Sequence, residues 1–126
     1  MIFGIGTDIL QAERVHKAYV RFGEHFVHRL LMPQELELFQ RTKRPERFLA
    51  MRFAAKEAIV KAMGTGFANG MWIRDAGFLP NRLGRPEIIF SPRGRARCAT
   101  LGIGEGHLTL TDEAGLIVAV AVLMKA

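Results

Sequence analysis

Cysteine is almost absent from this chain of 126 residues, and its single cysteine, Cys98, cannot form an intrachain disulfide. One cysteine also excludes a zinc site built on a CxxC motif. Long apolar runs are missing too, because the longest, 116–124, is well short of the roughly 20 residues that a membrane helix needs. The first ten residues lack a basic segment and contain Asp8, so no signal peptide is expected. We therefore expect a cytoplasmic protein.

What the chain does contain is typical of one globular domain. Hydrophobic residues make up 49% and charged residues 24%, which argues against disorder. The length suits a single domain, 1–126. Basic residues number 18 against 12 acidic ones, and 13 of the 18 are arginine, the side chain suited to forked recognition of phosphate and carboxylate. The partners should be anionic, and nucleic acid, an acidic protein and a polyphosphate metabolite all fit.

The hydrophobic pattern predicts an α+β domain, with helices mostly in the N-terminal half and an antiparallel β-sheet after them. Pro45 should start the longest helix and Gly64 should end it, while Ser91 should cap the last one. Cys98 and Trp72 are expected in the core. The expected helices are a segment ending at 23, then 24–31, 33–39, 45–63 and 92–101; the expected strands are 2–7, 72–79, 86–90, 107–112 and 116–124.

Two acidic residues on distant elements are the first candidates for chemistry. Asp8 closes the first predicted strand and Glu57 lies in the longest helix, with Lys61 one turn later on the same face. The first strand must pair far along the chain, most naturally with the last hairpin, and the long helix could then bring Glu57 near Asp8. Together they could hold Mg²⁺, which often takes only one or two protein carboxylates. A turn-capping role for Asp8 and a solvated Glu57–Lys61 pair remain open.

Glycines and basic residues supply the remaining candidates. Gly64-Thr65-Gly66 ends the helix and could offer N–H groups to phosphate, although a plain helix stop is also common. The cluster around Lys43 and Arg44 is either a solvated face or a phosphate site. A basic stripe on the first helix, formed by Arg14, Lys17 and Arg21, could receive an acidic partner.

These motifs, in this order, resemble the holo-acyl-carrier-protein synthase family, the small 4'-phosphopantetheinyl transferases. The resemblance spans almost the whole chain. It rests on Gly4-Ile5-Gly6-Thr7-Asp8-Ile9, on Arg52-Phe53-Ala54-Ala55-Lys56-Glu57-Ala58 running into Lys61 and Gly64-Thr65-Gly66, on Gly84-Arg85-Pro86, and on His107-Leu108-Thr109-Leu110-Thr111-Asp112-Glu113.

The resemblance implies the 4'-phosphopantetheinyl transferase fold and transfer of phosphopantetheine from coenzyme A to a serine of apo acyl carrier protein, which supports fatty acid biosynthesis. Asp8 and Glu57 would hold Mg²⁺, and Lys61 would approach the pyrophosphate of coenzyme A. Glu57 or a metal-bound water could remove the serine proton. The family forms homotrimers with active sites between subunits. Further coenzyme contacts would come from Lys43, Arg44, Arg52, Gly64, Thr65, Gly66, Pro86 and His107, and Arg14, Lys17 and Arg21 would receive the carrier protein.

One departure and two alternatives accompany this hypothesis. Some relatives have asparagine just before the Gly-basic-Pro motif, where this chain has Leu83, and Asn81 lies two residues away. A nucleic-acid-binding module would also explain the charge of +6, but no base-stacking motif stands out, so neither nucleic acid nor membrane is expected as a partner. A transferase fold that binds coenzyme A without activity is the other alternative.

Overall fold

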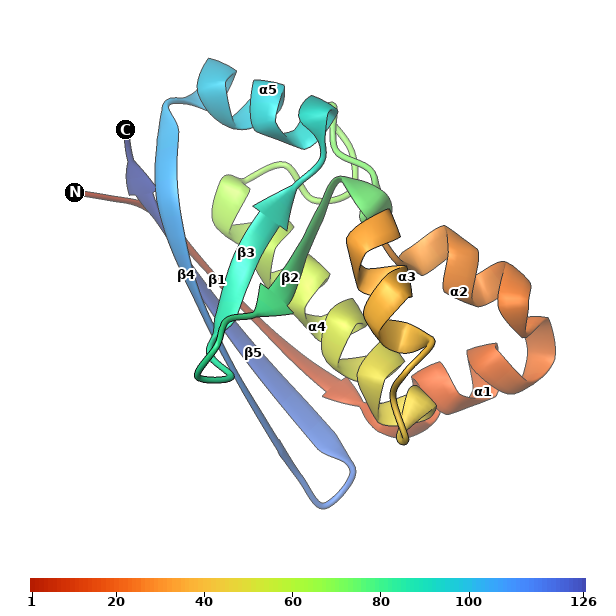
Figure 1. Ribbon diagram of the computed structural model, residues 1–126. Coiled ribbons are helices and arrows are strands. Elements are labelled where there is room, and N and C mark those ends of the chain that lie inside the picture. Colours follow the sequence, from red (N-terminus) through yellow and green to blue (C-terminus); the bar gives the residue numbers. More distant parts are fainter.

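The computed structural model describes residues 1–126 as a mixed α+β fold with five α-helices and five strands (Figure 1). Strand β1 (Ile2–Gln11) comes first, and four helices follow it. A short 3₁₀ turn, η1 (Ile73–Asp75), precedes the rest of the β structure. The helices are α1 (Ala12–Phe22), α2 (Glu24–Leu30), α3 (Pro33–Phe39), α4 (Pro45–Met63) and α5 (Pro92–Leu101); the later strands are β2 (Ala76–Pro80), β3 (Pro86–Phe90), β4 (Ile103–Glu113) and β5 (Leu116–Lys125).

The strands form two antiparallel sheets. A three-stranded sheet has the order β1-β5-β4, and β2 pairs with β3 in a separate hairpin. The first strand therefore pairs with the last, as the sequence predicts, with Asp8 opposite Ala119 and Gln11 opposite Leu116. Both termini lie together at one end of this sheet (Figure 1), where Lys125 donates its N–H to the backbone oxygen of Met1.

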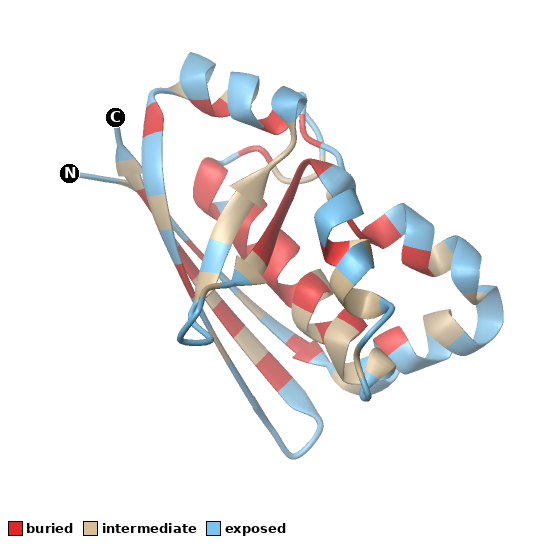
Figure 2. Ribbon diagram, viewed as in Figure 1, coloured by how far each residue is buried: buried red, intermediate tan, exposed pale blue.

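Helix α4 is the centre of the molecule. It packs on one face of the three-stranded sheet, and β2 contacts it from another side. Figure 2 shows it as the most buried helix, whereas α1, α2 and α5 expose much of their length. Leu49, Ala54, Ala58 and Ile59 are all fully buried in the core. The predicted helix ends are confirmed: Pro45 opens α4 and Gly64 closes it in the left-handed conformation.

Two glycines allow β1 to approach α4 closely. A Cβ on Gly4 would overlap the carbonyl oxygen of Ala62, and a Cβ on Gly6 would overlap that of Ala58. Only glycine removes this clash, since the obstacles are backbone atoms of a helix. The small residues in the middle of α4 thus receive a neighbouring backbone, which brings Asp8 of β1 beside Glu57 and Lys61 of α4.

Three predicted strand boundaries are wrong. The first strand continues to Gln11, because pairing with β5 satisfies its backbone along its full length, so Asp8 lies inside the strand and not at its end. The predicted strand 72–79 begins as the η1 turn, held by the Trp72 N–H that donates to the Asp75 carboxylate at 2.8 Å, and becomes β2 only at Ala76. Strand β4 begins at Ile103, four residues before the prediction.

The two residues expected in the core have different positions. Cys98 is buried, and burial raises the pKa of its thiol. Trp72 is 65% exposed, so that expectation is wrong. Its ring lies against the guanidinium of Arg93, whose charge centre is 4.0 Å from the ring centroid. Asp75 also holds Arg93, at 3.0 Å, so a cation–π contact replaces burial for this tryptophan.

The face of the three-stranded sheet that points away from α4 is open and apolar. Ile5 and Ile9 of β1 are 59% and 65% exposed. They pair with Val122 and Val118 of β5, which are partly exposed on the same face. An uncovered surface of this kind marks an interaction site. None of the helices is both long enough and apolar enough to cross a bilayer.

Candidate functional site

Helix α4 carries the predicted site residues on two different sides. Residues five apart on an α-helix point roughly 140° away from each other. Arg52 therefore faces the β2–β3 hairpin, where it contacts Phe78, while Glu57 and Lys61 face β1. The helix thus contributes to two separate clusters of functional side chains.

The first cluster, which we call the carboxylate pair, consists of Asp8 and Glu57 with Lys61 beside them. Lys61 donates to the backbone oxygen of Thr7 at 3.0 Å and lies 3.4 Å from Asp8 Oδ1. It forms no ion pair with Glu57, so the solvated Glu57–Lys61 pair is not what the structure contains. Asp8 has only 14% of its side chain exposed and accepts no N–H from its own strand, so it does not cap a turn.

Asp8 and Glu57 are close enough for the charge of Asp8 to affect the pKa of Glu57. Burial raises the pKa of Glu57, and the charge of Asp8 raises it further, while Lys61 and Arg14 oppose the shift. Burial and the Asp8 charge both favour the neutral acid, so a cation placed between the two carboxylates would favour the ionised form of the pair. Glu57 has no hydrogen-bond donor, which leaves its oxygens free.

This donor set fits a hard divalent cation. No group of three or more His, Cys, Asp or Glu residues comes together anywhere in the chain, so a zinc-type site is absent. Two neighbouring carboxylates, Asp8 nearly buried and Glu57 partly buried, suit Mg²⁺, which completes its shell with water and phosphate oxygens. Asp8 and Glu57 are the residues that would hold it.

The second cluster, which we call the basic pocket, is a cavity of about 470 Å³ between α4, the β2–β3 hairpin and β4. Lys43, Arg44, Arg52 and Pro86, all predicted to contact coenzyme A, line it. Lys43 and Arg44 are exposed, whereas Arg52 is nearly buried. Arg47 also lines the cavity, but it is paired with Asp112 at 2.8 Å, and that hydrogen bond raises its pKa. A pocket with four cationic side chains, of which Arg47 is paired with Asp112, and with a hydrophobic wall suits a ligand with a phosphate and an aromatic ring.

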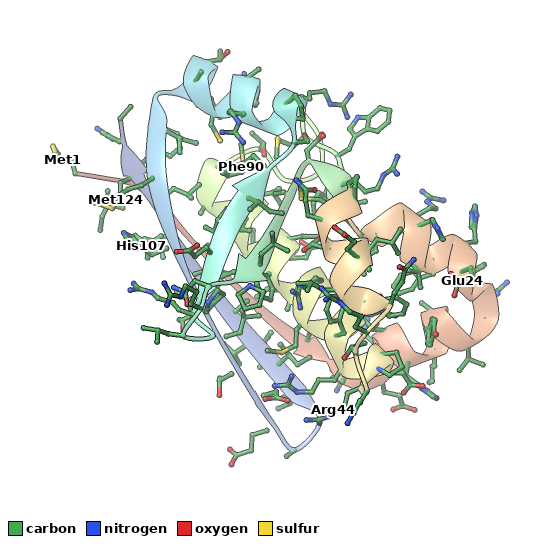
Figure 3. The ribbon with its side chains drawn as sticks, in the orientation of Figure 1. Met1, Glu24, Arg44, Phe90, His107 and Met124 are labelled. Carbon is green, nitrogen blue, oxygen red and sulfur yellow. The ribbon has the colours of Figure 1, made fainter.

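The two clusters lie on opposite sides of the fold within one chain. Asp8 belongs to β1, at one edge of the three-stranded sheet, and Thr109 of the basic pocket belongs to β4, at the other edge. His107 also lies on β4, far from Arg44 in Figure 3, and it does not line the pocket. Its side chain is half exposed on the open face of the sheet, 3.9 Å from Glu105. A single chain therefore does not bring all the predicted residues together.

The glycine loop after α4 forms a helix stop, which is one of the two roles that the sequence left open. The N–H groups of Thr65 and Gly66 both donate to the backbone oxygen of Val60, and that of Gly64 donates to Lys61. The Thr65 hydroxyl donates to Gly66 at 2.9 Å. These backbone donors close the helix in the left-handed conformation of Gly64, so they are not free for a phosphate.

The basic stripe on α1 is exposed, as expected for a docking surface. Arg14, Lys17 and Arg21 are all exposed, although Lys17 lies 3.7 Å from Glu13. Arg14 is close enough to Glu57 to lower its pKa, so the stripe begins beside the carboxylate pair. A protein bound along α1 would therefore reach the candidate metal site.

Asn81, two residues before Leu83, has a structural role in the hairpin between β2 and β3. Its Oδ1 accepts the N–H groups of Leu83 and Arg85, at 2.9 and 3.0 Å, and so holds the turn between β2 and β3. Leu83 itself is at the exposed tip of that turn. Position 83 of this chain therefore carries no polar side chain.

Sequence reasoning missed a buried ion pair next to the basic pocket. Lys56 and Glu35 are both fully buried and lie 2.7 Å apart. The sequence spacing could have indicated that Lys56 is buried. Lys56 lies seven residues after Leu49 and four after Arg52, which places it on the buried stripe of α4. Nothing comparable marks Glu35 as its partner.

This chain is similar to known proteins over almost its whole length. The 4'-phosphopantetheinyl transferase superfamily profile matches residues 4–121. The chain is 44% identical over 125 residues to the holo-[acyl-carrier-protein] synthase of Vibrio cholerae, covering 99% of both chains. The fold matches the holo-[acyl-carrier-protein] synthase of Neisseria meningitidis with a TM-score of 0.95 and 38% identity, covering 99% of this chain and 100% of that one.

A third match is a holo-(acyl-carrier-protein) synthase from Bacillus anthracis in complex with CoA (3',5'-ADP). Its TM-score is 0.82 at 31% identity, with 100% of this chain and 99% of that one covered. The expected α+β transferase fold is confirmed by these structures. Motif order, fold and full-length similarity lead to one conclusion: the chain belongs to the 4'-phosphopantetheinyl transferase superfamily, among the holo-[acyl-carrier-protein] synthases.

Proposed function

We propose that this chain transfers 4'-phosphopantetheine from coenzyme A to a serine hydroxyl of apo acyl carrier protein and releases adenosine 3',5'-bisphosphate. The observation that carries the proposal is the carboxylate pair with Lys61 at its side, held together by the close approach of β1 and α4. The relatives' names support the acceptor, and the Bacillus anthracis complex supports the donor.

The reaction needs positioning and charge compensation more than covalent catalysis. The serine oxygen forms a bond to the phosphorus that carries pantetheine, and the bond from that phosphorus to the bridging pyrophosphate oxygen breaks. Lys61 offers a half-exposed ammonium to the charge that develops on the leaving bisphosphate. Mg²⁺, held by Asp8 and Glu57, would neutralise pyrophosphate charge. Glu57 is the carboxylate of this site suited to take the serine proton.

The adenosine end of coenzyme A fits the basic pocket. Lys43 and Arg44 offer exposed cations for the 3'-phosphate. Arg52 lies in the wall of the same pocket, and Pro86 and Thr109 line it as well. The half-exposed His107 would contact the coenzyme from the open face of the sheet. Thr65 and its two flanking glycines would contact it by side-chain or Cα atoms only, because their N–H groups are already used.

A homotrimer with active sites between subunits explains why one chain holds the two clusters apart. The open sheet face with Ile5 and Ile9 would be covered by a neighbouring copy. The carboxylate pair of one subunit would then meet the basic pocket of the next. Covering this apolar face is a physical reason to assemble.

The exposed basic stripe of Arg14, Lys17 and Arg21 is the proposed docking surface for the acidic carrier protein. We place the enzyme in the cytoplasm, acting as a single domain in fatty acid biosynthesis, with no nucleic acid or membrane as partner. The test is incubation with coenzyme A, Mg²⁺ and apo acyl carrier protein. The expected result is a carrier protein whose mass has increased by one phosphopantetheine group. Absence of the mass increase with folded protein would refute the proposal.

A further inference from the structure

A buried ion network joins α3, α4 and β2 behind the basic pocket. Lys56 Nζ lies 2.7 Å from Glu35 Oε1 and donates to the backbone oxygen of Ala76 at 2.6 Å. Arg52 is the third charged member, with its Nε 3.5 Å from Glu35 Oε2. The network contains two cations and one carboxylate, so one buried positive charge has no counter-ion within it.

The carboxylate of Glu35 is already used by other donors. Oε1 accepts Lys56 and the N–H of Met32 at 3.0 Å, and Oε2 accepts the N–H of Phe78 at 3.1 Å. Arg52 Nε is buried and has no hydrogen-bond partner. Its Nη2 makes only a long contact, 3.4 Å, to the backbone oxygen of Phe78. Arg52 therefore keeps most of its hydrogen-bonding capacity.

Aromatic side chains hold the Arg52 guanidinium in place. Its charge centre lies 3.9 Å from the ring centroids of both Phe48 and Phe78. Both rings line the basic pocket together with Arg52. The guanidinium is thus held in the pocket wall mainly by stacking, because its ion pair with Glu35 is the longer, 3.5 Å contact.

We infer that Lys56 is a positioning residue for anion binding: by occupying the Glu35 carboxylate, it prevents Arg52 from being neutralised and leaves the Arg52 charge available to a phosphate in the basic pocket. The inference rests on the proposed coenzyme site. Lys56 is fully buried and reaches a ligand only through Glu35 and Arg52. This inference assigns a function to a buried ion pair whose desolvation otherwise only costs folding free energy.

The titration behaviour of the network agrees with this arrangement. Burial lowers the pKa of Lys56, and the charge of Glu35 and its hydrogen bond oppose that shift. Burial lowers the pKa of Arg52 to about 10, so it is still charged near neutral pH. Glu35 opposes the burial shift of both cations, but its contact with Lys56 is 2.7 Å whereas Arg52 Nε lies 3.5 Å away, so the shorter contact goes to Lys56.

The first test is Lys56→Gln, with adenosine 3',5'-bisphosphate as the probe. Glutamine keeps donors for Glu35 and for the Ala76 oxygen but removes the charge, so Glu35 turns to Arg52 as its only cation. Calorimetry should show a Kd for the bisphosphate about tenfold higher, since a charge-assisted hydrogen bond is lost. Lys125→Gln, the same change at an exposed strand end, should leave the Kd unchanged. An unchanged Kd in Lys56→Gln would overturn the inference.

The second test is the double variant Glu35→Gln/Lys56→Gln, which removes the carboxylate as well. Arg52 then has no acid to neutralise it, so bisphosphate affinity should return to within about twofold of the wild type. A purely structural role predicts the opposite, because two core changes would weaken binding at least as much as one. The double variant leaves no unpaired carboxylate, so it can be measured even if Lys56→Gln alone does not fold. Loss of bisphosphate binding in the double variant overturns the inference.

The wild type separates failure of this inference from failure of the proposed function. If the wild type does not bind the bisphosphate, the coenzyme site is wrong and the inference falls with it. If the wild type binds and Lys56→Gln binds equally well, only the role of Lys56 is wrong.

Discussion

Replacing Gly6 by alanine tests the packing that brings the carboxylate pair together. Gly6 lies in β1 directly against α4, where a Cβ would overlap the carbonyl oxygen of Ala58 and crowd the backbone nitrogen of Ala62. Backbone atoms of a central helix cannot rotate aside as a side chain can. The strand and the helix must therefore separate by about 1 Å to restore normal contact distances.

The size of the effect follows from this separation. Overpacking of a core costs about 1–3 kcal/mol, and for a domain of this length each kcal/mol lowers Tm by about 4 °C. The protein should therefore remain folded but melt about 4–12 °C lower. Asp8, two residues further along β1, moves away from Glu57 and Lys61, and a misplacement of about 1 Å can lower kcat about 100-fold.

The assay combines thermal unfolding with the kinetics of phosphopantetheine transfer. The matched control is Gly106→Ala in β4, where a Cβ would meet only the side-chain ends of Leu123 and Ile88 as its close neighbours. These can shift, so the control should lose about 1 kcal/mol or less and keep kcat within a few-fold. If Gly6→Ala matches the control in both Tm and kcat, the close approach of β1 and α4 does not position the site.

Three further predictions concern charge. Asp8→Ala and Glu57→Ala should each lose Mg²⁺-dependent transfer by at least about 100-fold while keeping the fold, as judged by circular dichroism, and full activity in both would remove the metal site. Arg14→Glu should raise the KM for the carrier protein by at least about tenfold and leave coenzyme A binding nearly unchanged, with Lys125→Glu as the control; an unaltered carrier-protein KM would contradict the docking surface. Burial alone would raise the pKa of Asp75, but hydrogen bonds from a serine hydroxyl, a backbone N–H and an arginine lower it below its usual range. Asp75 therefore stabilises the fold above about pH 4, and this contribution disappears as the pH falls through its lower folded-state value. In denaturant titrations Asp75→Asn should thus be less stable than the wild type at pH 7, with the difference shrinking toward pH 2–3; a gap that does not depend on pH would contradict this.

The parts of the fold that depend on local chemistry were predictable. Pro45 and Gly64 delimit α4, and Ser91 caps α5 by accepting the N–H of Gly94 at 3.0 Å, because caps act over three or four residues. The hairpin between β4 and β5 was predictable for the same reason, because its tight turn is set by neighbouring residues that include Gly115. The pairing of β1 with β5 was also predicted, because every other strand follows the helical half of the chain and β1 had to find its partner far along the sequence.

The misplaced elements depend on distant contacts. The exposure of Trp72 rests on Arg93, which lies 21 residues later and replaces the core as its partner. The extension of β1 to Gln11 depends on pairing with Leu116. The sequence pattern within each of these two segments does not indicate that Arg93 or Leu116 will be its partner.

By itself, the sequence determined the family, the helix boundaries and the list of acidic and basic residues available for chemistry on a phosphate. Only the tertiary structure decided how these residues are grouped. The close approach of Gly6 to α4 puts Asp8 beside Lys61, and the turn of α4 sends Arg52 to the other side, into a pocket supported by Glu35 and Lys56. The physical reason is that a charge acts through its distance to other charges and its burial, and both are set by backbones that meet only after the chain has folded.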